Sequence, residues 1–323
     1  MNITEKENFL MVMDGKIPEW IPNYTDVVEG AGSSYLSWKP TGVPDMVIDN
    51  FGVEFHFTAD GPVPANTVTR NFQIEEVTDW EKVMPNIDLD ANDWEADAKR
   101  AVSKIDRNEK VINYIFGGMW EEMHYIMGFE NALTSLAAEP EATSDFLNAI
   151  ADFRIDAMRR FCKYLKPDIV MISEHITTHR GLLMSPTAYK TVIKPIHQRV
   201  YDAVRELGAI PQMHVDGYVE EVLEDYHDIG VRMLQPFQVF NDINKYKKLY
   251  NIVAVGGWDA FGPGNRPEST EEDMRASVRL AMDSYGPGGM YVFWRSGVTR
   301  KQTDRMQILD DEARKYGRAF YKK

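Results

Sequence analysis

One stretch of the chain ends in two side chains that suit metal or acid–base chemistry. Residues 210–217 read I-P-Q-M-H-V-D-G, an apolar expected strand that finishes with His214 and Asp216. Residues two apart on a strand point to the same side, so this imidazole and this carboxylate should face one place. A metal accepts such a pair as two of its ligands, and an acid–base mechanism uses it as a base and its orienter. A hydrogen-bonded histidine followed by a helix-capping aspartate is the structural alternative.

A second pair, Glu174 and His175, follows the expected strand at residues 168–173. Neighbours in an extended segment point apart, so only one of the two should face His214 and Asp216. That residue would complete three nitrogen and oxygen ligands and leave a fourth position open, as in catalytic zinc sites. We therefore take His214, Asp216, Glu174 and His175 as candidate catalytic residues, with His214, Asp216 and Glu174 as the zinc ligands.

Aromatic and polar residues follow the other expected strand ends and form a candidate substrate-binding set. These residues are Trp120, His124, Tyr125, Gln235, Trp258, Trp294, Arg295 and Ser296. Aromatic walls with a few polar groups suit a flat, apolar substrate. Aromatic residues near strand ends are also ordinary core and lid residues, so the composition leaves both interpretations open.

The elements that must position these residues alternate regularly between strand and amphipathic helix. Strands are expected at residues 110–116, 168–173, 210–217, 231–235, 252–255 and 290–294. Two weaker candidates, residues 20–24 and 50–55, would raise the number to eight. This alternation predicts parallel β/α units, and we expect a single-domain (β/α)₈ TIM barrel over residues 1–323 with an irregular N-terminal region. A doubly wound sheet is the alternative.

Local signals mark where several helices begin. Ser185 followed by Pro186 predicts a helix N-terminus, because serine caps the free amides and proline suits the first turn. Ser269 is the predicted cap of a helix that runs to about residue 285, and a last helix is expected at 303–321. Cys162 lies in a helical stretch and is expected to pack there without chemistry.

The bulk composition excludes several classes of partner. The 323 residues carry a formal net charge of -14 and lack clustered Lys and Arg, so we expect no nucleic-acid partner. No apolar run approaches the roughly 20 residues of a spanning helix, and the N-terminus lacks the form of a signal peptide. We expect a cytoplasmic protein without membrane association. The motifs G-x-x-x-x-G-K-S/T, strand-linked G-x-G-x-x-G and G-x-S-x-G are absent, which argues against nucleotide binding and esterase chemistry.

Three segments resemble the uroporphyrinogen decarboxylase superfamily. Residues 116–128, F-G-G-M-W-E-E-M-H-Y-I-M-G, are similar to the family's G-F-x-G-x-P-W-T-L-x-x-Y-M segment. Residues 180–186 resemble its small-residue loop before a Ser-Pro helix start, and residues 252–259 its penultimate-strand motif. The resemblance implies a barrel. The decarboxylases carry two substrate-binding arginines in an N-terminal segment that here reads W-I-P-N-Y-T-D, and the histidine of their G-H-G-I is Ser296. A tetrapyrrole substrate is therefore not expected.

The corrinoid-linked methyltransferases of this superfamily resemble the chain through an H-x-C-G motif. His214 and Gly217 match it, while Asp216 replaces the first cysteine and Ser296 the later one. These harder ligands suit an oxygen-bearing substrate better than a thiol. The resemblance implies zinc, a corrinoid-binding partner protein and demethylation of a methoxylated, aromatic small molecule, and it is compatible with a homodimer.

Two other functions stay open from the sequence. One is a cofactor-free decarboxylase of a small acid, in which Asp216 or His214 donates the proton and Arg295 or Arg180 holds the carboxylate. The other is a barrel that binds a ligand without turnover.

Overall fold

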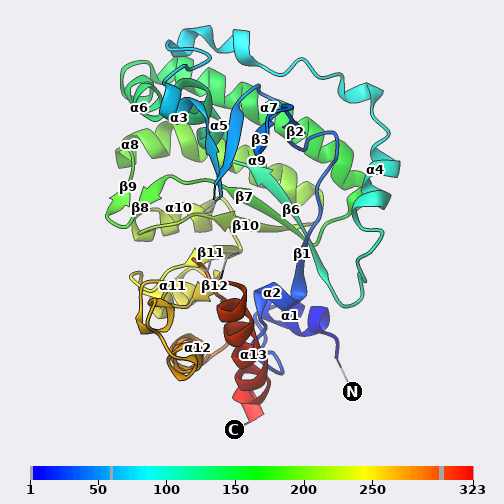
Figure 1. The fold of residues 1–323 in the computed structure, drawn as a ribbon, viewed down its shortest axis with the longest axis vertical. Coiled ribbons are helices and arrows are strands. Elements are labelled where there is room, and N and C mark those ends of the chain that lie inside the picture. Colours follow the sequence, from blue (N-terminus) through cyan, green and yellow to red (C-terminus); the bar gives the residue numbers. More distant parts are fainter. Residues whose placement is uncertain (1–2, 59–60, 298–301, 323) are drawn as a thin grey trace.

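A curled parallel sheet of seven strands forms the centre of the protein (Figure 1). The computed structural model describes residues 3–58, 61–297 and 302–322. Along the sheet the order is β1, β6, β7, β10, β11, β12 and β13, and every pairing is parallel. The strands are Val28–Gly30, Val111–Gly117, Ile169–Ser173, Ile210–His214, Met233–Phe237, Val253–Gly257 and Tyr291–Trp294. The six stronger expected strands thus form, and the fold is TIM-barrel-like.

The eight strands of a closed barrel are not confirmed among the described residues. The expected strand at 20–24 is wrong, because helix α2 (Tyr24–Val27) begins inside it. Pro22 has no N–H to donate to a ladder, and the segment makes one isolated parallel bridge, from Asn23 to Phe293. The N–H of Phe293 donates to the Pro22 carbonyl at 2.9 Å. This contact joins the segment before α2 to the last strand.

The segment at 50–55 belongs to a separate sheet rather than to the central one. An antiparallel sheet is built from β2 (Lys39–Pro40), β3 (Met46–Ile48), β4 (Glu54–Thr58) and β5 (Gly61–Pro64). Gly52, with a φ of +83°, sits in the turn that reverses the chain between β3 and β4. Phe55 of β4 packs edge-on against Tyr125, with 5.2 Å between ring centroids. Part of the irregular N-terminal region is therefore an ordered sheet against the helix that contains Tyr125.

Helices connect and cover the parallel strands, and α7 is the longest (Figure 1). The helices besides α2 are α1 (Glu5–Met13), α3 (Asn66–Thr69), α4 (Trp94–Ala101), α5 (Met119–Met127), α6 (Phe129–Ala138), α7 (Pro140–Leu165), α8 (Pro186–Ala188), α9 (Lys194–Glu206), α10 (Leu223–Asp228), α11 (Ile243–Leu249), α12 (Glu271–Tyr285) and α13 (Thr303–Ala319). A two-stranded ribbon, β8 (Thr177–Thr178) and β9 (Gly181–Leu182), follows β7. No helix in the described ranges has the length and apolarity to cross a bilayer.

The expected helix starts are right at one position and displaced by one residue at another. Ser185 caps α8 by accepting from the Ala188 N–H at 3.1 Å. For α12 the cap is Thr270 instead of Ser269, because Thr270 and Asp273 form a reciprocal capping box. Ser269 instead donates its hydroxyl to the Pro263 carbonyl.

The inner and outer faces of the sheet carry separate apolar clusters. On the inner face, Val111, Ile169 and Met233 pack with Phe9 and Val12 of α1, which covers the amino ends of the strands. The outer face packs on the surrounding helices, and Cys162 of α7 is buried there as expected. Because α1 fills the amino end, the carboxyl ends of the strands are where a site can open.

Candidate functional site

His175, His214 and Asp216 converge at the carboxyl ends of β7 and β10. These strands are neighbours, and His214 pairs with Ser173, so the residue two positions beyond Ser173 lies beside His214. One donor atom from each of the three side chains lies within 4.8 Å of the other two. The Nε2 atoms of His175 and His214 are 3.3 and 3.7 Å from Oδ2 of Asp216. The expectation that His214 and Asp216 face one place therefore matches the structure.

Glu121 of α5 orients the His175 ring. Its Oε1 lies 2.6 Å from Nδ1 of His175 and accepts the His175 backbone N–H at 3.0 Å. This contact leaves Nε2 of His175 directed at Asp216. Hydrogen bonds to Asp216 and then to Glu121 raise the pKa of His175 to about 10. Glu121 was not among the predicted site residues, although it lies in the family-like segment at 116–128.

The two carboxylates of this site stay ionised. Burial raises the pKa of Asp216, but the hydrogen bonds from His175 and His214 outweigh this effect. The resulting pKa of Asp216 is well below its usual range. Burial likewise raises the pKa of Glu121, and hydrogen bonds with His124 and His175 reverse the shift. Carboxylates that accept from imidazoles favour the charged forms of both partners.

Glu174 does not join this group, which corrects its expected place among the metal ligands. Its side chain is fully buried on the opposite side of the extended segment from His175, as expected for neighbours. Its carboxylate accepts from the backbone N–H groups of Trp120 and Glu121 at 3.2 and 3.4 Å. It also lies 3.1 Å from Nε2 of His197, which is fully buried. Glu174 thus anchors the start of α5, and His175 takes its place beside Asp216.

His197 is a buried polar residue that the sequence did not single out. It lies on α9, just after a π-helical turn at Tyr189–Ile193. Pro195, two residues before it, has no N–H for the helical ladder. π-Helical turns concentrate at functional sites. His197 contacts Glu174, and Glu174 accepts from the backbone amides at the start of α5. These contacts position Glu121, which in turn orients His175.

Two members of the candidate substrate set lie against His214. Oε1 of Gln235 is 3.2 Å from its Nδ1, which leaves Nε2 to face Asp216. Trp294 packs edge-on, with 6.2 Å between the ring centroids. Trp294 also meets Tyr24 edge-on at 6.2 Å, so an aromatic wall stands beside the histidine.

His124 and Tyr125 contact Glu121 rather than the histidine cluster itself. Nε2 of His124 is 3.7 Å from Oε2 of Glu121, and the Tyr125 hydroxyl donates to the same oxygen. Both side chains thus surround the carboxylate that orients His175.

The remaining members of the candidate set are held in the protein interior. Trp120 is fully buried, and the Trp258 indole N–H donates to the Ser277 hydroxyl on α12 at 2.9 Å. Arg295 is 8% exposed and forms a two-point ion pair with Asp310. An arginine engaged in this way is not available to a substrate carboxylate, which removes one anchor of the decarboxylase alternative. Ser296 is also buried.

Gly217 fixes the turn that follows Asp216. Its φ is +123°, and a Cβ there would lie 2.6 Å from the Thr178 carbonyl oxygen. The Gly217 N–H donates to Oε1 of Gln238 at 2.6 Å, and the Thr177 hydroxyl donates to the Asp216 carbonyl at 2.5 Å. The backbone that carries Asp216 is therefore held on both sides.

Comparison with known proteins finds a similar structure and a matching family. A methyltransferase from Methanosarcina mazei is similar in structure, with a TM-score of 0.71 and 14% sequence identity over 98% of this chain and 99% of that chain. No match to a curated protein sequence is found. Residues 46–294, well over half of the 323 residues, match the uroporphyrinogen decarboxylase (URO-D) family. The chain therefore belongs to the uroporphyrinogen decarboxylase family.

Proposed function

We propose that this protein is a methyltransferase that removes the methyl group of a methoxylated aromatic compound and passes it to the cobalt of a corrinoid-binding partner protein. The observation that carries the proposal is the convergence of His175, His214 and Asp216 on one point. The similar fold of a protein described as a methyltransferase adds support.

The donor set fits zinc. Two imidazole nitrogens and one carboxylate oxygen are ordinary zinc ligands, and three protein ligands leave a position for substrate. Each ring is already oriented through its other nitrogen, His175 by Glu121 and His214 by Gln235. Such outer contacts are typical of zinc-bound histidines. When bound here, zinc would supply a Lewis acid that polarises the ether oxygen.

The residues around the cluster would bind and orient the substrate. Trp294, edge-on to His214, offers an apolar face for an aromatic ring. In the proposed reaction the methyl–oxygen bond would break, and the Co(I) corrinoid of the partner would supply the electron pair of the new bond to the methyl carbon, which makes the cobalt Co(III). The electron pair of the broken bond stays on the oxygen, which leaves as a phenolate and takes up one proton.

A metal-free acid set is a second candidate, and the protonation of His175 favours it. With a pKa of about 10, this imidazole carries a proton at neutral pH and could give it to the leaving oxygen. Zinc would have to displace that proton, because metal-bound histidine is neutral. The two candidates therefore differ in metal content and agree in the residues used.

An anaerobic assay with cob(I)alamin as the methyl acceptor tests the function. We expect the zinc-loaded protein to convert 2-methoxyphenol or a related methoxybenzene to the free phenol, with an equal amount of methylcobalamin. His214→Ala should lose this turnover, while His227→Ala, at an exposed histidine on α10, should keep it. Carbon dioxide release from a carboxylic acid without any corrinoid would instead favour the decarboxylase.

A further inference from the structure

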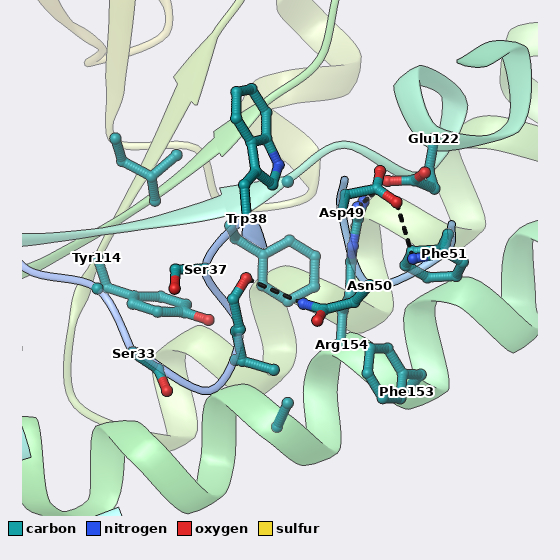
Figure 2. A pocket seen from close by; sticks show the side chains of 16 residues that line it. Ser33, Ser37, Trp38, Asp49, Asn50, Phe51, Tyr114, Glu122, Phe153 and Arg154 are labelled. Carbon is teal, nitrogen blue, oxygen red and sulfur yellow. Dashed lines mark hydrogen bonds and ion pairs between the residues drawn. The ribbon is translucent and has the colours of Figure 1, made fainter. Parts of the chain in front are cut away.

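A cavity of about 380 Å³ is lined by residues other than the histidine cluster, and Figure 2 shows its lining side chains. It is enclosed by the segment after β1, the turn before β4, the carboxyl end of β6, and helices α5 and α7. None of His175, His214 and Asp216 lines it. Its volume is in the range of small-molecule sites.

Aromatic rings form part of the walls of the cavity. Trp38, Phe51, Tyr114 and Phe153 come from four separate segments of the chain, and Figure 2 shows their rings around the hollow. Phe51 and Phe153 meet edge-on, with 5.7 Å between centroids. Aromatic walls from separate elements provide a large, flat apolar contact surface.

Hydrogen bonds hold these walls in place. Oδ1 of Asp49 accepts from the backbone N–H groups of Phe51 and Val53, each at 2.9 Å. The amide of Asn50 donates to the Leu36 carbonyl at 2.9 Å and ties the two loops together. A cavity with fixed walls loses little conformational entropy when a ligand enters.

One end of the cavity carries a carboxyl pair and a guanidinium. Asp49 and Glu122 face each other there, as Figure 2 shows. Two carboxylates that face each other repel when both are ionised, and this favours a pair that shares one proton. Oε1 of Glu122 is a buried oxygen without a hydrogen-bond partner among the described residues. Burial raises the pKa values of both groups, that of Glu122 to about 8.

The charges at this end cancel at neutral pH. Arg154 donates to Oε2 of Glu122 and to the Gly118 carbonyl, so its guanidinium is already engaged. One guanidinium and one shared negative charge sum to zero. A charged ligand would lose its hydration in the cavity without gaining a free counter-charge. A neutral ligand has no charge to dehydrate and avoids this cost.

We propose that this cavity is a second ligand site, which binds a neutral aromatic compound whose hydroxyl group hydrogen-bonds the Asp49–Glu122 carboxyl pair. The proposal does not depend on methyl transfer. Glu121 and Glu122 are neighbours on α5, so this helix carries one carboxylate to the histidine cluster and the next to the cavity.

Three probes of similar size and different charge test the site: phenol, benzoate and benzylammonium. Binding is measured by calorimetry and by tryptophan fluorescence, because Trp38 lines the cavity and is 40% exposed. We expect phenol to bind at least about tenfold more tightly than either charged probe, a difference of about 1.4 kcal/mol. Tightest binding by benzoate or benzylammonium, or no saturable binding of phenol, would overturn the proposal.

Variants identify the place of binding. Trp38→Ala should weaken phenol binding about tenfold. Glu122→Gln, which resembles the protonated acid, should keep affinity within about threefold, while Glu122→Ala should lose about tenfold. Phe261→Ala, at an exposed aromatic outside the cavity, should leave phenol binding unchanged. Wild-type affinity in folded Trp38→Ala would show that phenol binds elsewhere and would contradict the proposal.

Discussion

The carboxylate of Glu174 occupies the space in which a side chain at Gly118 would lie. A Cβ built on Gly118 would be 1.7 Å from Oε2 of Glu174 and 2.3 Å from the carbonyl oxygen of Ser173. The absence of a side chain therefore allows β7 to place a buried carboxylate directly beneath the start of α5. This packing brings Glu174 within reach of the Trp120 and Glu121 amides.

We expect Gly118→Ala to destabilise the protein severely, by more than about 4 kcal/mol, because part of the clash is with backbone and cannot relax cheaply. Thermal or urea unfolding measures the loss. Gly30→Ala is the matched control, since a Cβ at Gly30 meets no atom within 4 Å. Equal stability of the two variants would show that the Gly118 contact can rearrange.

Glu121→Gln should weaken zinc binding without removing a ligand. The charged partner of Nδ1 of His175 is lost, and such outer contacts contribute about 10- to 100-fold in metal affinity. Competition with a chromogenic chelator measures the zinc dissociation constant. Glu224→Gln, at an exposed position on α10, serves as the control and should bind zinc like the wild type. Unchanged affinity in Glu121→Gln would remove this residue from the site.

The Asp49–Glu122 pair should make stability depend on pH. The pKa of Glu122 is raised from 4.5 to about 8, so the unfolded chain loses this proton first as pH rises. The contribution of Glu122 to the free energy of unfolding is complete below about pH 4.5, falls between about pH 4.5 and 8, and is constant above that. The total loss is about 1.4 kcal/mol for each unit by which the folded and unfolded pKa values differ.

Glu122→Gln cannot ionise and should lose this decline. Urea unfolding at pH 5 and pH 8.5 measures the free energy of unfolding of the wild type and the variant. The wild type should lose more stability than Glu122→Gln between the two pH values, and Glu224→Gln should behave like the wild type. Parallel pH profiles for wild type and Glu122→Gln would mean that Glu122 titrates normally in the folded protein.

The sequence predicted the parts of the fold that depend on local periodicity. The six stronger strands and the start of α8 at Ser185 follow from apolar patterns and capping chemistry, which neighbouring residues determine. The prediction that residues 20–24 and 50–55 form barrel strands is wrong, because the pairing of a short strand depends on partners that are distant in the sequence. A short apolar segment cannot indicate whether it will join a parallel sheet, begin a helix or turn into a hairpin.

The candidate site was predictable only where strand geometry determined it. The shared side of His214 and Asp216 follows from their spacing, and the opposite directions of Glu174 and His175 follow from their adjacency. Which of these two would face the cluster depends on Gly118, whose missing side chain makes room for the Glu174 carboxylate. Glu121 on α5 and His197 on α9 reach the site through tertiary contacts, with His175 and Glu174 respectively. No local sequence pattern indicates such contacts.

The zinc content of the protein tests the central claim most directly. Protein purified without chelator and then dialysed is analysed by plasma mass spectrometry. The proposed site predicts about one zinc ion per wild-type chain and far less in folded His214→Ala and Asp216→Asn, with His227→Ala retaining the metal. Sub-stoichiometric zinc in the wild type after incubation with excess zinc, or equal zinc in His214→Ala, would contradict a metal site at His175, His214 and Asp216.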